Sequence, residues 1–121
     1  MINFDSNIPI YIQVMDYIKK EIVSGKLKSG DQVDTVREMA IFFGVNPNTI
    51  QRALQELERE GLLKSERTSG RFISATSETI QELKLHQGHE KTTRYVIEMK
   101  SLGFTKEETV NLVKESKGDN E

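Results

Sequence analysis

The sequence predicts a mainly α-helical fold that includes one small β-hairpin. Apolar residues recur at helical spacing in five segments, and residues 62–74 have the pattern of strand, turn and strand. The composition shifts near residue 75, from apolar-rich to polar and helix-forming. We therefore expect one domain over residues 1–75 and a two-helix tail over residues 76–121, which together have the size of one small protein.

The composition excludes several classes of function. The 121 residues include no cysteine, so a disulfide framework, a thiolate metal site and a cysteine nucleophile are excluded. The sequence has no Gly-rich phosphate loop, Ser-His-Asp set or H-E-x-x-H motif, which argues against an enzyme and against a bound cofactor or metal. The net charge is -2, so the overall charge by itself gives no sign of a nucleic-acid-binding protein.

The sequence also lacks the usual targeting features. It contains no run of about 18 apolar residues, and its first residues form neither a basic segment nor an apolar one. We therefore expect a cytoplasmic protein that has no membrane-spanning helix.

The first helix is expected over residues 9–24. Pro9 suits the first turn of a helix, and Gly25 suits its end because glycine adopts a positive φ without penalty. One face of this helix is apolar and is predicted to be buried; it consists of Tyr11, Val14, Met15, Ile18 and Ile22.

The next two helices are short and close together in the sequence. The second is expected over residues 36–43, where Thr35 and Glu38 have the spacing of a capping box. The third is expected to begin after Asn46, a good N-cap, and to stop before Gly61. The predicted buried residues of the two helices are Val36, Met39, Ala40, Phe43, Ile50, Ala53, Leu54 and Leu57.

The hairpin is expected from residues 62–66 and 71–74, with a basic tip between Arg67 and Arg71 and with Phe72 in the core. Two tail helices follow, over residues 76–100 and 105–116. Apolar residues are sparse in both tail helices, so these helices must pack on the first domain or on another chain.

The order of helix, short helix, tight turn, helix and hairpin is that of a winged helix-turn-helix. The major groove of DNA admits one α-helix, whose N-terminal residues meet the base edges. The third helix has an apolar face and an opposite face of flexible hydrogen-bonding side chains, Asn48, Gln51, Arg52 and Gln55. The pattern therefore predicts binding to double-stranded DNA.

Six consecutive motifs carry a resemblance to a known family. They read PIYIQV at residues 9–14, GKLKSGD at 25–31, VDTVREMA at 33–40, GVNPNTIQRA at 44–53, LEREGL at 57–62 and RTSGRFI at 67–73. In this order and spacing, the sequence resembles the GntR family of bacterial transcription regulators over about residues 8–74. The resemblance implies a winged-helix regulator of transcription.

Two positions depart from the family pattern. Asp34 stands where the family has a proline, and Thr68 stands where it has the first glycine of the hairpin tip. Either the acid weakens the expected phosphate contact at the start of the second helix, or the loss of the proline only makes the turn less stiff. Both departures bear on DNA affinity or sequence preference and leave the expected fold unchanged.

The short tail is similar to that of the YtrA-like subfamily. That resemblance implies a homodimer formed through residues 76–121, which binds a palindromic operator and represses transcription. The middle of the tail, from Lys84 to Arg94, is polar and contains Gly88. We hypothesise that it lets the two DNA-binding heads change their spacing in response to an unidentified small-molecule effector.

The resemblance also implies which residues contact DNA. Arginine that pairs with guanine is the commonest specific contact, so Arg52 is the strongest candidate for reading a base. The full set is Thr35, Arg37, Asn46, Asn48, Thr49, Gln51, Arg52, Arg67, Ser69, Gly70 and Arg71.

Simpler interpretations of these residues remain open. The Arg52 face also fits a solvated helix surface, and Thr35 caps its helix in any case. The remaining alternatives are that Arg37 pairs with Glu38 or Glu21 and that Arg67 and Arg71 only flank the hairpin.

Two other functions compete with the regulator. The acidic composition, Asp34 and Thr68 fit a winged-helix module that binds proteins and has lost DNA binding. His86 and His89, three residues apart on a polar helix, fit a metal sensor, although spacing fixes no third ligand.

Overall fold

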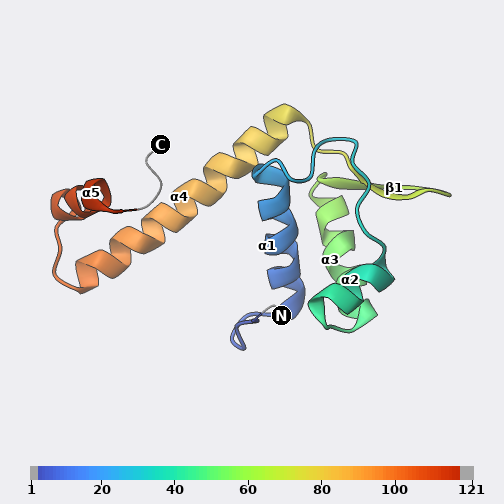
Figure 1. The fold of residues 1–121 in the computed structure, drawn as a ribbon, viewed down its shortest axis with the longest axis horizontal. Helices are drawn as coiled ribbons and strands as arrows, with labels where there is room; N and C mark the ends of the chain where they lie inside the picture. Colours follow the sequence, from blue (N-terminus) through green and yellow to red (C-terminus); the bar gives the residue numbers. More distant parts are fainter. Residues whose placement is uncertain (1–2, 118–121) are drawn as a thin grey trace. The chain divides into compact units, whose positions relative to one another are not determined.

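The computed structural model describes residues 3–117 and confirms the predicted order of elements (Figure 1). The described elements are α1 (Ile10–Val23), α2 (Val36–Phe43), α3 (Pro47–Arg59), β1 (Leu63–Glu66), β2 (Gly70–Ile73), α4 (Ser77–Ser101) and α5 (Lys106–Glu115). Every helix begins and ends within one or two residues of the expected position. The second strand begins one residue earlier than expected, because Gly70 pairs with Glu66 instead of lying in the turn.

Contacts divide the chain into two compact units, with the boundary after Leu83. The first unit contains α1 to β2 and the start of α4, and the second contains the rest of α4 and α5. Ile80 and Leu83 of α4 pack against the core of the first unit, which is why the start of this helix belongs there.

The core of the first unit lies where α1 and α2 pack on α3. The four apolar residues of α3 are fully buried, and those of α1 and α2 close over them. Confirmed as buried are Val14, Met15, Ile18, Ile22, Met39, Ala40, Phe43, Ile50, Ala53, Leu54 and Leu57. Tyr11 and Val36 are half-buried against this core.

The two helices of the helix-turn-helix have the predicted caps. The Thr35 hydroxyl accepts a hydrogen bond from the Glu38 amide at 3.1 Å, and the Thr35 amide donates to the Glu38 carboxylate at 2.9 Å. Gly44 ends α2 with a φ of 70°, which favours glycine, and Asn46 accepts from the Asn48 amide at 2.7 Å. The turn is therefore fixed at both ends by local hydrogen bonds.

The hairpin is held by a segment that precedes α2. Strands β1 and β2 pair antiparallel, with Leu63 opposite Ile73. The Val33 amide donates to the Arg71 carbonyl at 3.0 Å, and the Ile73 amide donates to the Asp31 carbonyl at 2.8 Å. Residues 31–33 therefore run beside β2 like a short third strand, which no sequence pattern had indicated. Phe72, which was expected in the core, is only partly buried and does not belong to the core cluster.

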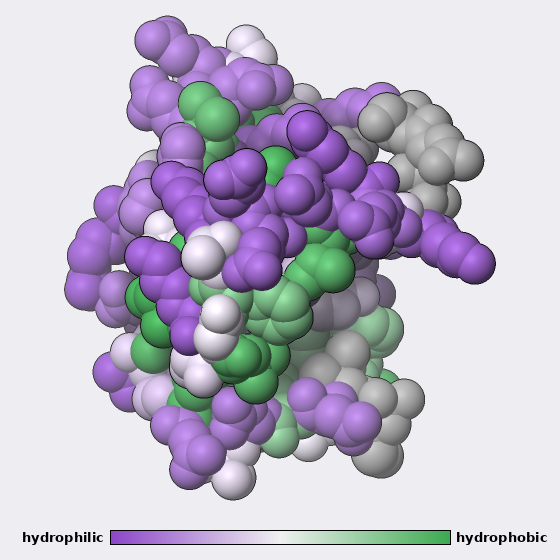
Figure 2. All heavy atoms as spheres, turned by 90° about the vertical axis from the view of Figure 1, so that its left-hand side faces the viewer, coloured by the Kyte–Doolittle hydropathy of each residue, from purple (hydrophilic) through white to green (hydrophobic). Residues whose placement is uncertain are grey.

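The second unit exposes much of its apolar surface. Helix α4 has no buried residue, and in α5 only Thr109 is buried. The exposed apolar side chains are Leu85, Tyr95, Ile97, Leu102, Val110, Leu112 and Val113. Figure 2 shows hydrophobic side chains uncovered between hydrophilic ones. Within residues 3–117, no helix is both long enough and apolar enough to cross a bilayer.

Candidate nucleic-acid interface

The N-terminal half of α3 presents a polar surface of the expected kind. Asn46, Asn48 and Arg52 are exposed, whereas Thr49 and Gln51 are partly buried at the edge of this surface. The first turn of α3 holds no acidic residue, so the partial positive charge of the helix start is unopposed. Such a helix start suits phosphate and base edges.

The Arg52 side chain is held in place. Its guanidinium carbon lies 3.9 Å from the centre of the Tyr11 ring, a cation–π geometry between α3 and α1. Stacking restricts the side chain before any partner is bound. Stacking uses the face of the guanidinium, so the N–H donors at its edge remain available for a bidentate contact.

The start of α2 adds a second polar patch. Thr35 and Arg37 are exposed there, as expected for DNA contacts, and Thr35 is engaged as the helix cap. Hydrogen bonds from Thr35, foremost from its backbone amide, hold the pKa of Glu38 below its usual value. Glu38 is therefore a carboxylate at neutral pH and keeps the cap formed.

The acidic residues of α3 are paired with cations. Glu56 pairs with Arg59 at 3.0 Å, and Glu60, the residue just after α3, pairs with Lys19 at 2.9 Å. Glu58 pairs with Arg71 of β2. The negative charge of this helix lies in its second half and is largely compensated, which explains how a chain of net charge -2 can present a DNA-binding helix.

The hairpin tip is anchored by Gln32. The Gln32 side-chain amide donates to the Ser69 carbonyl, and a Cβ added to Gly70 would lie 2.9 Å from the same amide nitrogen. Gly70 also has a φ of 104°, a backbone conformation that favours glycine. Thr35 follows Gln32 by three residues, so the residue that anchors the tip lies within about 11 Å of the start of α2.

The two arginines of the hairpin have different surroundings. Arg67 is exposed at the tip, where a phosphate can reach it. The Arg71 side chain is only 18% exposed and bonds to Glu58, which also accepts from the Ser65 hydroxyl at 2.7 Å. Arg71 therefore positions the hairpin against α3, and its charge is already compensated.

Glu58 makes the hairpin sensitive to acid. Burial raises the pKa of this carboxyl, but hydrogen bonds from Arg71 and Ser65 and the charge of Arg71 outweigh burial, so the pKa is lowered. A lowered pKa stabilises the folded state above the unfolded value of about 4.3, and this contribution is lost as the pH falls through the folded value.

We expect Glu58→Gln to lower the free energy of unfolding by about 1 kcal/mol at neutral pH, because both side chains of the pair keep some solvent contact. The difference from wild type should shrink below about pH 4.3, and urea unfolding between pH 3 and 7 measures it. Glu66→Gln, which breaks an exposed pair with Lys64, is the control and should change little. A difference that stays constant with pH would contradict this role.

Of the two histidines of α4, His86 lies beside Glu90, which also pairs with Arg94 and so forms a ladder. His86 and Arg94 lie 3.3 Å and 3.2 Å from the two oxygens of Glu90. Over residues 3–117, no group of three or more metal-binding side chains comes together. The ladder links successive turns of one helix.

A helix-turn-helix with a polar second helix, packed beside a hairpin, defines the class of winged-helix DNA-binding proteins. The chain belongs to the GntR family, because the family model described as "Bacterial regulatory proteins, gntR family" matches residues 10–73. It is therefore a DNA-binding regulator of transcription and not an enzyme.

Two full-length relatives place the chain in the YtrA-like subfamily. It is 44% identical to the HTH-type transcriptional regulator YhcF of Bacillus subtilis, with 92% of each chain covered. It is 34% identical to the HTH-type transcriptional repressor YtrA of the same organism, with 98% of this chain and 94% of YtrA covered. Both alignments include the tail.

Solved structures agree with the fold. A GntR family transcriptional regulator from Listeria monocytogenes is 37% identical, with a TM-score of 0.86 over 94% of this chain and all of that one. The DNA-binding domain of AraR in complex with operator ORR3 is 31% identical, with a TM-score of 0.55 over 61% of this chain and 89% of that one. These likenesses do not favour an interaction module that has lost DNA binding.

Proposed function

We propose that the chain is a cytoplasmic repressor that binds a palindromic operator as a homodimer. The observation that carries the proposal is the start of α3, where a stacked arginine and the exposed amide side chains of Asn46 and Asn48 lie at a helix N-terminus without acidic residues. The name of the relative YtrA and the operator complex of the AraR domain support the same function.

Each proposed DNA contact has a role that fits its position. Arg52, Asn48 and Gln51 contact base edges, and Asn46 and Thr49 bind the sugar-phosphate backbone of DNA and so position the start of α3. Thr35, Arg37, Arg67, Ser69 and Gly70 contact phosphates, and Arg71 acts through the hairpin that it positions. Two such heads place their α3 helices about 34 Å apart, or a multiple of that spacing, in successive major grooves.

The experiment is fluorescence anisotropy with DNA from upstream of the chain's own gene and with random DNA of equal length. The protein should prefer its own DNA, and its affinity should fall roughly 10³-fold or more between 50 and 200 mM salt, because bound phosphates release counterions. Weak binding that is alike for both DNAs across several upstream fragments would reject the function.

We propose that the homodimer forms through the apolar surface of the second unit. Ile97 and Leu102 are 62% and 72% exposed, an unfavourable state for large apolar side chains in a helix. A second copy of the same surface can cover them by twofold symmetry. The polar segment from Lys84 to Arg94 then lies between the two heads and sets how freely their spacing varies.

Replacing both Ile97 and Leu102 with glutamate should convert the dimer to a monomer, because the interface would bury unpaired charges. Sedimentation equilibrium measures the oligomeric state. The affinity for the palindromic operator should also fall when the dimer is lost. Ile41→Glu introduces the same charge at a residue of α2 that is 76% exposed, and should leave the dimer intact. An unchanged dimer in the double variant would place the interface elsewhere.

A further inference from the structure

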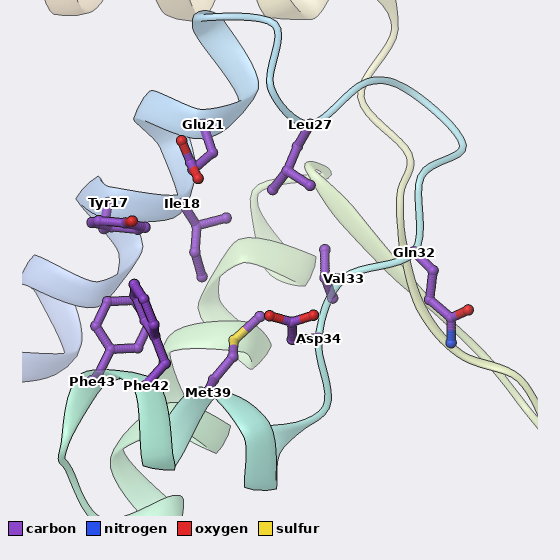
Figure 3. A pocket seen from close by; sticks show the side chains of 10 residues that line it. All are labelled: Tyr17, Ile18, Glu21, Leu27, Gln32, Val33, Asp34, Met39, Phe42 and Phe43. Atoms are coloured by element: carbon purple, nitrogen blue, oxygen red, sulfur yellow. The ribbon is translucent and has the colours of Figure 1, made fainter.

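A cavity of about 250 Å³ opens in the first unit between α1, α2 and the segment that joins them. In Figure 3, the rings of Tyr17, Phe42 and Phe43 form one side, and Val33 and Asp34 lie across from them. None of the residues proposed to contact DNA lines it. The cavity is therefore a feature that the regulator function leaves unexplained.

The aromatic side of the cavity is unusual for a surface. The Tyr17 ring centre lies 5.7 Å from that of Phe42 and 5.2 Å from that of Phe43, and the two phenylalanine rings meet edge to face at 5.0 Å. Phe42 remains 56% exposed even so. Clustered ring faces attract cations and apolar groups.

The charged groups of the cavity are both acids. Glu21 and Asp34 line it, and no lysine or arginine does. Lys26 lies 3.8 Å from Glu21, but its side chain is 74% exposed, so this pair is loose. Asp34 stands at the family's proline position, and the cap of α2 is made by Thr35, so the fold has no need of the Asp34 carboxylate.

We propose that this cavity binds a small organic cation, a protonated or quaternary amine that carries one ring or a short branched alkyl group. The aromatic side receives the apolar body and the ring faces attract the charge, while Glu21 and Asp34 neutralise it. The volume lies below the range for drug-sized ligands, which limits the occupant to a small molecule.

The position of the cavity connects it to the DNA-binding elements. Gln32, Val33 and Asp34 line it, and the same segment bonds to the hairpin and leads into α2. A bound cation restrains this segment and neutralises two acids in the DNA-binding unit. Both effects favour DNA, so the ligand acts as a co-repressor; this part rests on the proposed function.

Binding is tested with the full chain and three probes that share a phenyl ring and differ in charge: benzyltrimethylammonium, benzyl alcohol and benzoate. Amide NMR shifts of Tyr17, Asp34 and Phe42 should saturate with the cation at a millimolar dissociation constant. Glu21→Gln, Asp34→Asn and Phe42→Ala should each weaken binding about threefold or more. Asp16→Asn removes a charge from α1 outside the cavity and should change nothing.

Three results would overturn the site. If benzyl alcohol shifts the same amides as much as the cation does, the cavity is only an apolar groove. If Asp16→Asn weakens binding as much as Glu21→Gln or Asp34→Asn, the cation is attracted only by the general negative charge of the protein. Cavity amides that ignore the probe but change with protein concentration would make the occupant a second copy.

The regulatory part is tested by DNA affinity with the saturating cation or with the same concentration of sodium chloride. Wild type should bind its operator about threefold more tightly with the cation, and Asp34→Asn should lose this ratio. Unchanged affinity despite probe binding overturns the co-repressor role alone. Absence of DNA binding in both conditions counts against the proposed function instead.

Discussion

Arg52→Ala is expected to remove most of the preference for operator over random DNA, at a cost of about 1–3 kcal/mol in specific binding. The physical reason is the bidentate geometry of the guanidinium, which the Tyr11 ring holds in one orientation. Binding to random DNA should fall much less, because it depends on phosphate contacts. Fluorescence anisotropy with both DNAs separates the two effects.

Two further variants make the result specific. Arg52→Lys keeps the charge but loses the planar fork, so it should also lose preference while retaining affinity for random DNA. Arg59→Ala removes a cation at the far end of α3 that is already paired with Glu56, and should leave the preference intact. Equal losses from Arg52→Ala and Arg59→Ala would mean that α3 contributes only general charge.

Leu54→Ala is expected to cost about 2–5 kcal/mol of stability, a large part of the roughly 5–15 kcal/mol available to a small protein. Leu54 is fully buried in the middle of α3, where α1 and α2 close over the same helix. Removing its side chain therefore leaves a cavity between three helices. Urea unfolding at one fixed protein concentration measures the loss, because dimerisation also contributes to stability.

The neighbouring residue provides the control for this prediction. Gln55 is exposed on the same helix, so Gln55→Ala should change stability by no more than about 0.5 kcal/mol. A loss below 1 kcal/mol for Leu54→Ala would contradict the packing of α3 as the centre of the core.

Local rules of the sequence were enough to predict the helices and their buried faces. The spacing of Ile50, Ala53, Leu54 and Leu57 fixes which side of α3 is buried, and the structure leaves none of the four exposed. The caps at Thr35 and Asn46 were equally predictable, because each depends on residues two or three positions away. The polar face of α3 follows from the same periodicity, whereas the candidate DNA contacts were chosen from the family resemblance.

The surroundings of the site required the tertiary structure. Gln32 bonds to Ser69 across 37 residues, and Glu58 bonds to Arg71 across 13. No pattern in the sequence marks either pair, so the sequence predicted a DNA contact for Arg71 but not its ion pair with Glu58. The contact of residues 31–33 with the hairpin left only a weak signal in the sequence, the polar side chain of Gln32 between two expected elements.

The sequence by itself determined the family through its motifs. It also determined the order of the elements and the buried face of α3, because these depend on contacts within a few residues. The tertiary structure decided which charges remain free and where the acids gather. It pairs Glu56, Glu58 and Glu60 with cations and brings Glu21 and Asp34 to one cavity. Charges act through space, and only the folded chain sets the distances between residues far apart in sequence.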